Sequence, residues 1–346
     1  MPLVRAGVIA LSLAVLLSGC AGGAKTRSKT GSTSAAIGQI AFVRLNDWDP
    51  ESADSQGLFI TDPRGSSVRK IDLPRGWQVG GVVWSPDGKE LLVQGFVGNA
   101  NSAIIRADGT VVRLLDPNDP AAFLFCEAWS ADGATLLCRK DSDHHPEVEG
   151  IYSIRPDGTH LTRLTTPPYH SVTGAQGSCG GGDSQLDFSP NGEEFVLRRK
   201  RCGHGAQPWV DAKAALYVEN TDGSGLHKIV DYGLVRPHAG TVDWSPDGKE
   251  ILFGDDSGYL YTVHPDGSGL TQISVDTSKL VGFSPYAFLP AWSPDGRWIL
   301  FSMGSANGTG LDRVALWWAK PDGSHLTKTI AGHPGIGNAS WSQAGG

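Results

Sequence analysis

Apolar and polar residues alternate in short runs along this chain of 346 residues, as in Glu90-Leu91-Leu92-Val93 and Arg297-Trp298-Ile299-Leu300-Phe301. Alternation with a period of two over four to eight residues predicts β-strands with one buried face. The 46 glycines and 21 prolines favour turns and strands over long helices. We therefore expect an all-β protein.

Two motifs recur along the chain. The first is WSPDG, which is intact at three places and varied at three more, with leading aromatics Trp84, Trp129, Phe188, Trp244, Trp292 and Trp341. The gaps between these aromatics are 45, 59, 56, 48 and 49 residues. The second motif is an apolar strand, a DG turn and another strand, as in LYTVHPDGSGLTQI, and it also occurs six times if LFITDPRGSSVRKI is included.

The turn chemistry explains this spacing. In Ser-Pro-Asp-Gly, Pro presets φ, Asp bonds its own backbone and Gly takes the left-handed position, which suits a hairpin with a type I turn and a bulge. Each unit then contains four strands, A to D, with one hairpin at each motif. A repeated four-stranded unit of this length is a propeller blade. We predict a six-bladed β-propeller of four-stranded antiparallel blades over residues 38–346.

The two ends of the repeat region predict how the ring closes. The repeats start at a B strand, Gln39–Val43, and stop at an A strand, Asn338–Ser342. The C-terminal strand would then complete the first blade and remove an open sheet edge.

The N-terminal residues look like a targeting signal outside the fold. Arg5 precedes an apolar stretch, Ala6–Leu17, that is too short to span a bilayer as a stable helix. It ends in Leu17-Ser18-Gly19-Cys20, which resembles a bacterial lipobox; the alternative is an ordinary signal peptide with a chance cysteine. We predict a signal peptide over 1–19, a lipid on Cys20 and a flexible tether over 20–37. The expected location is the extracytoplasmic side of a membrane, the outer one if the cell has two.

WSPDG together with DGSxLxxLT resembles the TolB-type propeller repeat over about residues 38 to 343. The resemblance is specific for the fold and says little about function. TolB proteins carry an α/β domain before the propeller and are soluble in the periplasm, whereas this chain has a tether and a predicted lipid. The role of TolB in envelope translocation is therefore not carried over.

Four cysteines remain besides Cys20. Cys126 and Cys138 lie at equal distances from the Ala131-Asp132-Gly133 turn, so they should face each other across one hairpin. Cys179 and Cys202 are nearly opposite across the next. Because an exported protein favours oxidation, we predict disulfides Cys126–Cys138 and Cys179–Cys202, with free thiols or a metal site as the alternatives.

Strand order places the long B–C and D–A connections on one face, here called the loop face, and variable loops on a rigid scaffold are common binding sites. The candidate binding residues on this face are Trp48, Trp77, Tyr169, His170, Trp209, His238, Tyr286 and His333. Glu127, Asp187 and Asp243 lie in predicted A strands close to the motif aromatics. They would line the central channel or, alternatively, bond neighbouring blades.

One loop contains possible metal ligands, namely Asp141, Asp143, His144 and His145. The spacing matches no metalloprotease motif, and a solvated loop is the alternative. We expect no cofactor other than the lipid, although a metal ion stays possible.

Catalytic motifs give little support for an enzyme, since the chain has no G-x-S-x-G elbow, phosphate loop or dinucleotide fingerprint. The net charge is −7, and the basic residues are scattered without a stripe, so we expect no nucleic-acid partner. The favoured function is a monomeric envelope lipoprotein that binds a protein, peptide or glycan without catalysis. The alternatives are a metal-dependent carbohydrate-active enzyme that uses loop-face histidines, similar to propeller lyases, and a structural scaffold.

Overall fold

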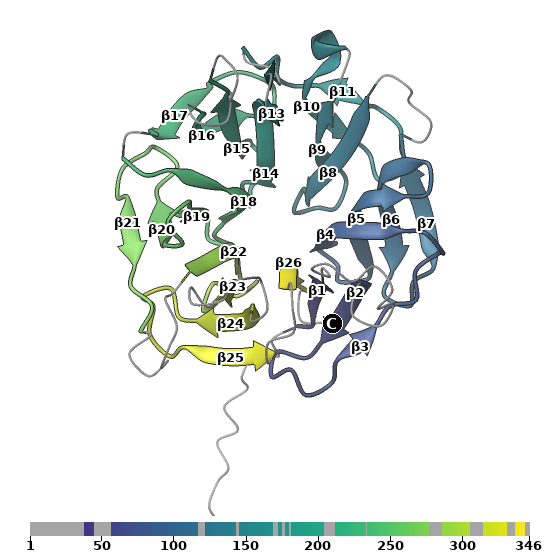
Figure 1. Ribbon diagram of the computed structural model, residues 1–346, viewed down its shortest axis with the longest axis vertical. Coiled ribbons are helices and arrows are strands. Elements are labelled where there is room, and N and C mark those ends of the chain that lie inside the picture. The colour runs from purple at the N-terminus through teal and green to yellow at the C-terminus, as the bar shows by residue number, and fades with distance from the viewer. Residues whose placement is uncertain are drawn as a thin grey trace, which may run out of the picture. The chain divides into compact units, whose positions relative to one another are not determined.

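The computed structural model describes residues 38–44, 57–116, 122–142, 145–168, 172–174, 177–179, 181–203, 212–232, 234–276, 286–304, 314–330 and 336–342. These residues form six four-stranded antiparallel sheets arranged around a central axis (Figure 1). The predicted six-bladed β-propeller is thereby confirmed. No helix in the described ranges is long and apolar enough to cross a membrane.

The first three blades use residues 40–163 together with the last strand. Blade 1 consists of β26 (Ile336–Trp341), β1 (Ile40–Arg44), β2 (Gly57–Thr61) and β3 (Arg69–Lys70). Blade 2 consists of β4 (Gln78–Trp84), β5 (Glu90–Val97), β6 (Ala100–Arg106) and β7 (Val111–Leu115). Blade 3 consists of β8 (Phe123–Trp129), β9 (Leu136–Asp141), β10 (Gly150–Ile154) and β11 (Thr162–Arg163), with the short 3₁₀ helix η1 (Pro146–Val148) before β10.

The other three blades follow a short hairpin of β12 (Val172–Gly174) and β13 (Gly177–Cys179). Blade 4 consists of β14 (Gly182–Phe188), β15 (Glu194–Arg201), β16 (Lys213–Asn220) and β17 (His227–Val230). Blade 5 consists of β18 (Pro237–Trp244), β19 (Ile251–Asp255), β20 (Leu260–Val263) and β21 (Thr271–Ile273). Blade 6 consists of β22 (Tyr286–Trp292), β23 (Ile299–Gly304), β24 (Ala315–Ala319) and β25 (Thr327–Ile330).

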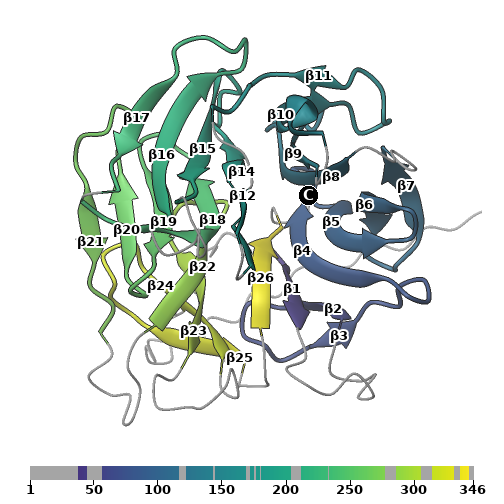
Figure 2. The same cartoon turned by 45° about the horizontal axis from the view of Figure 1, so that its top comes forward.

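The ring closes through the C-terminal strand, as the sequence predicts. Strand β26 pairs with β1 in antiparallel register, with Ile40 opposite Trp341 and Ala41 opposite Ser340. In Figure 2 this last strand lies beside β1, within the first blade. The closure leaves the inner edge of β1 paired rather than exposed.

The SPDG hairpins have the expected turn chemistry. In the first of them, the N–H of Gly88 donates to the carbonyl of Ser85 at 2.9 Å, and the Ser85 hydroxyl donates to Asp87 at 2.8 Å. Gly88 has φ of 68°, a left-handed conformation that glycine adopts at little cost. The repeated Asp is therefore structural.

The core is divided among the blade junctions. Among the described residues six hydrophobic clusters form, each joining two neighbouring blades. Every cluster contains one leading aromatic of the WSPDG motifs, for example Trp84 between blades 1 and 2 and Phe188 between blades 3 and 4. These aromatics pack between blades, so the repeat encodes the junctions as well as the turns.

Candidate functional site

The innermost strand of each blade carries an irregularity at an equivalent place. In all six pairs of A and B strands the register shifts within the seven residues before the motif aromatic, at points such as Val79/Gly81 and Ser184/Leu186. A bulge of this kind bends a strand and redirects side chains, and it is common beside binding sites.

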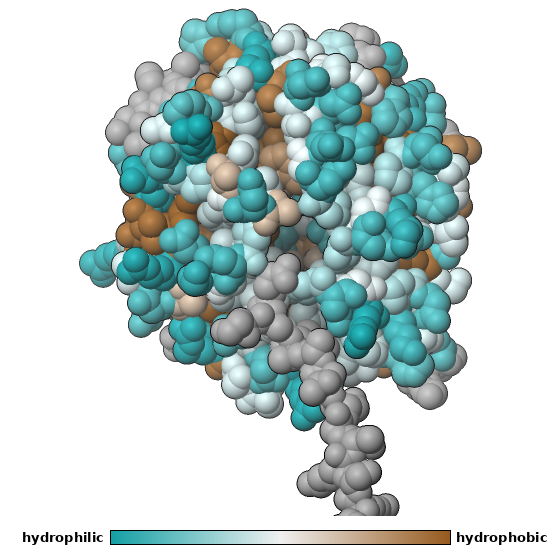
Figure 3. All heavy atoms as spheres, turned by 180° about the vertical axis from the view of Figure 1, so that it is seen from behind, coloured by the Kyte–Doolittle hydropathy of each residue, from teal (hydrophilic) through white to brown (hydrophobic). Residues whose placement is uncertain are grey.

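The bulged strands surround a cavity of about 420 Å³ on the propeller axis, here called the channel cavity. All six innermost strands contribute to its wall, which includes Gly80, Glu127, Gln185, Gly240, Pro290 and Asn338. Because it is formed by the beginnings of A strands and by residues toward the ends of B strands, the channel cavity lies toward the loop face. Figure 3, the view from behind Figure 1, shows one face of the propeller, which is mostly hydrophilic with smaller apolar patches.

A second cavity, also of about 420 Å³, lies at the SPDG end of the axis and is lined by the six motif aromatics. Asp187 and Asp243 line both cavities. These two carboxyl groups therefore lie between the two halves of the central channel.

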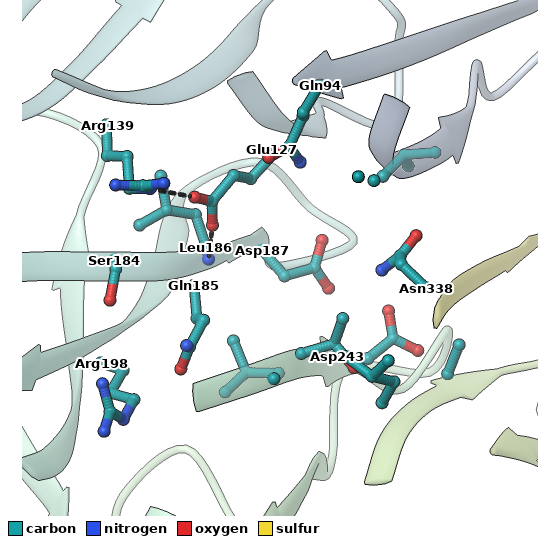
Figure 4. Close-up of a pocket in the computed structure, with 18 of the residues that line it drawn as sticks. Gln94, Glu127, Arg139, Ser184, Gln185, Leu186, Asp187, Arg198, Asp243 and Asn338 are labelled. Atoms are coloured by element: carbon teal, nitrogen blue, oxygen red, sulfur yellow. Dashed lines mark hydrogen bonds and ion pairs between the residues drawn. The ribbon is translucent and has the colours of Figure 1, made fainter. Parts of the chain in front are cut away.

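Asp187 and Asp243 combine two roles that the sequence analysis posed as alternatives. Each accepts a backbone hydrogen bond from the next blade, Asp187 from Trp244 at 2.7 Å and Asp243 from Trp292. Both also line the channel, where Figure 4 shows their carboxyl groups near the side chain of Asn338. Burial raises the pKa of Asp187 to about 7, and burial followed by the nearby Asp187 charge raises the pKa of Asp243 well above its usual value.

Glu127 likewise joins two blades while facing the channel. It accepts a hydrogen bond from Arg139 Nε at 2.8 Å and another from the Leu186 backbone N–H at 3.1 Å. Both bonds are drawn in Figure 4. Because Arg139 neutralises Glu127, the acidic part of the channel is confined to the two aspartates.

The basic side of the channel cavity was not predicted from the sequence. Arg198 and Lys200 line it, and they belong to Arg198–Arg201, a run of four basic residues that makes the description of scattered basic residues wrong at this point. Since Arg198 and Lys200 share one side of β15, the alternation of that run was a signal that could have revealed them. Arg199 on the other side pairs with Asp183 at 2.6 Å.

Two cavity residues have an unusual backbone conformation. Gln185 has φ of 53° and Leu289 has φ of 54°, in the left-handed region that non-glycine residues seldom occupy. Both lie at bulges and line the channel cavity. Such local strain is often found at functional sites, and it supports the choice of this cavity as the candidate site.

Most of the predicted loop-face residues lie outside the described residues. This applies to Trp48, Tyr169, His170, Trp209 and His333, whereas His238 and Tyr286 lie in β18 and β22 with side chains that are not described. Trp77 is described, and it packs against the hydrophobic cluster between blades 1 and 2. The loop-face assignment therefore stays a prediction.

The predicted metal loop is only partly described. Asp141 forms an ion pair with Arg139, and His145 Nδ1 lies 3.0 Å from the Glu147 carboxylate on the surface. Asp143 and His144 lie outside the described residues. Within the described ranges no three His, Cys, Asp or Glu side chains are grouped so that they could hold a metal ion.

Both predicted disulfides are confirmed. Cys126 bonds Cys138 across the β8–β9 hairpin. Cys179 bonds Cys202, which ties the β12–β13 hairpin to the end of the second strand of blade 4. Cys20 lies outside the described residues.

Several solved propellers are similar to this chain. A candidate TolB from Agrobacterium tumefaciens matches with a TM-score of 0.57 and 19% identity over 87% of this chain and 91% of that one. TolB from Acinetobacter baumannii matches with a TM-score of 0.61 and 17% identity over 89% and 67% of the two chains. Oligogalacturonate lyase in complex with manganese matches with a TM-score of 0.50 and 12% identity over 81% and 72%.

In sequence, no protein-family model and no curated protein matches the chain. Identities this low support a shared fold and do not extend to activity. The described chain is thus a six-bladed β-propeller similar in fold to TolB-type propellers.

Proposed function

We propose that this protein is a membrane-anchored binding module of the cell envelope, and that its partner docks at the loop-face opening of the channel cavity. The observation that carries the proposal is the cavity itself. It is lined by bulged strands and contains two basic side chains that no hydrogen-bonded carboxylate of the described chain neutralises. A concave site with a few polar groups on a rigid scaffold is typical of a ligand site.

The partner that we propose is an envelope protein, peptide or glycan. The loop residues Tyr169 and Trp209 would extend the binding surface around the channel opening. The likeness to TolB-type propellers is compatible with an interaction role, and it supplies no partner for this chain. The lipid on Cys20 would hold the module at the membrane surface.

Retention of a partner from an envelope extract tests the binding site. We expect the full-length protein to retain a partner from the extract. Lys200→Glu should weaken the binding of this partner at least tenfold, because the substitution reverses a charge in the cavity wall. Lys89→Glu makes the same change of charge at an SPDG turn, where Lys89 is exposed and pairs with Asp87. If Lys89→Glu weakens retention and Lys200→Glu does not, the binding face has been assigned to the wrong side.

The anchor is tested separately. Cys20→Ala should move the protein from the membrane fraction to the soluble fraction, because the acyl chains would have no attachment site. Fractionation and immunoblotting measure this change, with Cys179→Ala as a cysteine control that leaves the anchor intact. Unchanged membrane retention of Cys20→Ala would contradict lipidation.

A further inference from the structure

The channel cavity contains a pair of cations on one blade. Arg198 and Lys200 are two residues apart on β15, so they project from the same side of the strand, and both line the cavity. Burial lowers the pKa of Arg198 to about 10. Burial, followed by the charge of Arg198, lowers the pKa of Lys200. The two cations are therefore close enough to repel each other.

Few groups in the described part of the chain compensate the positive charges of Arg198 and Lys200. Arg198 is only 7% exposed, and its described hydrogen bond runs from Nε to the carbonyl of Pro237 at 3.0 Å, which leaves both terminal amino groups for another acceptor. Lys200 forms no ion pair or hydrogen bond within the described ranges. Asp256 is the acid whose charge acts on both cations, but burial outweighs it. A desolvated guanidinium without a carboxylate partner is energetically costly.

A pair of acids lies elsewhere in the same cavity. Asp187 and Asp243 come from neighbouring blades, and in Figure 4 they lie near each other and apart from Arg198. Each accepts one backbone N–H, which satisfies part of its hydrogen-bonding capacity. Because the charge of Asp187 raises the pKa of Asp243, the two carboxyl groups cannot both ionise easily unless a cation joins them.

We propose that the channel cavity binds a small zwitterionic ligand, whose carboxylate contacts Arg198 and Lys200 and whose ammonium group contacts Asp187 and Asp243. This inference rests on the proposed function, because it names the chemistry that the same cavity recognises. A ligand with one charge of each sign compensates both like-charged pairs at once. A ligand with a single charge leaves one pair uncompensated.

The strand register sets the size of the ligand. Arg198 is opposite Ser184, and Asp187 is opposite Val196, so the basic and acidic positions are two residues apart along the strands. Two residues of β-strand correspond to about 7 Å, and the side chains extend this separation at the basic end. The charges of the ligand should therefore be about 7–12 Å apart, which is the span of a short peptide with free ends.

Calorimetric titration of the full-length protein with three peptides tests the inference. The probes are triglycine, which carries both charges, triglycine amide, which lacks the carboxylate, and N-acetyl-triglycine, which lacks the ammonium. We expect triglycine to bind at least tenfold more tightly than either capped form. Lys200→Met and Arg198→Met should each weaken the binding of triglycine at least tenfold, and Lys89→Met should leave this binding unchanged.

Two results would overturn the inference. One is equal binding of triglycine and either capped form, and the other is no binding of triglycine at millimolar concentration. A thermal unfolding curve shows whether Arg198→Met folds. If it does not fold, Lys200→Met still tests the inference. If triglycine does not bind while Lys200→Glu still weakens retention of the partner, the proposed ligand class is wrong and the proposed binding function is supported. If triglycine does not bind and Lys200→Glu does not affect retention of the partner, the channel cavity is not the binding site.

Discussion

At the scale of single residues, the two channel aspartates link the stability of the fold to pH, because burial raises the pKa of both. The pKa of Asp187 rises to about 7 because of burial, although the Trp244 and Phe188 backbone N–H groups act in the opposite direction. An unfolded aspartate titrates near pH 4. Between about pH 4 and pH 7 the folded protein therefore binds more protons than the unfolded chain, so the free energy of unfolding falls as the pH rises.

Asp187→Asn should remove the part of this pH dependence that comes from Asp187, while Asp243 keeps its own part. The amide oxygen can still accept the Trp244 N–H, and no charge has to be buried. We expect the variant to match the wild type at pH 4 and to be more stable at pH 8, by up to about 4 kcal/mol for a shift of three pKa units. Urea unfolding at the two pH values measures the difference.

A surface aspartate supplies the control. Hydrogen bonds from Lys89 and Ser85 lower the pKa of Asp87, which is opposite in direction to the shift of Asp187. Asp87→Asn should therefore bring no gain at pH 8. A loss of stability at pH 8 in Asp187→Asn would mean that the charge itself holds the blades together.

At the scale of elements, the DG turns do more than reverse the chain. A side chain at Gly65 in blade 1 would meet the backbone carbonyl of Thr329 in blade 6, and one at Gly109 in blade 2 would meet that of Asp72 next to blade 1, both within 2.1 Å. Gly223, Gly267 and Gly323 also face the backbone of the preceding blade. These turns therefore need glycine for its φ and for close packing between blades.

A pair of glycine variants separates the two requirements. Gly109 and Gly192 both have positive φ, but a side chain at Gly192 would meet nothing within 4 Å. Gly192→Ala should cost about 1 kcal/mol from the backbone alone. Gly109→Ala should cost about 2–4 kcal/mol, because the clash with the carbonyl adds overpacking.

Chemical denaturation of the two variants measures the difference. Equal losses of unfolding free energy would show that the neighbouring blade adjusts freely and that only the turn conformation matters.

At the scale of the whole molecule, ring closure depends on one strand. β26 pairs with β1, and its residues Asn338 and Ser340 also accept backbone hydrogen bonds from Val82 and Trp84 of blade 2, each at 3.1 Å. Trp341 completes the cluster between blades 6 and 1. One strand thus contributes to two blade junctions.

Removal of residues 336–346 should abolish the monomeric propeller. The deletion uncovers the edge of β1 and the apolar side chains Ile40 and Phe42, and open edges promote aggregation. Size-exclusion chromatography should then show aggregates or unfolded protein. A synthetic peptide of residues 334–346 added during refolding should restore part of the monomer.

The matched control is removal of residues 343–346, which follow β26 and should be dispensable. A stable, monomeric protein without residues 336–346 would contradict closure by this strand.

Much of the fold was predictable because its determinants are local. The SPDG and DG turns follow from the conformational preferences of Pro, Asp and Gly within a few residues, and alternation defines the strands between them. Both disulfides could be placed, since a hairpin brings together residues at equal distances from its turn. The closing strand could be placed because the repeats start at a B strand and stop at an A strand. The turns and the disulfides need only neighbouring parts of the chain, and the closure follows from the order of the repeats.

The candidate site is different because its residues meet only in the closed ring. The sequence determined the blades, their number and their closure, and it pointed to Asp187 and Asp243 as channel residues. Only the tertiary structure decided that these acids and Arg198 line the same cavity, whose wall is formed by bulged strands from all six blades. The physical reason is that the cavity wall depends on bulges and on contacts between blades, which local preferences of the chain do not encode.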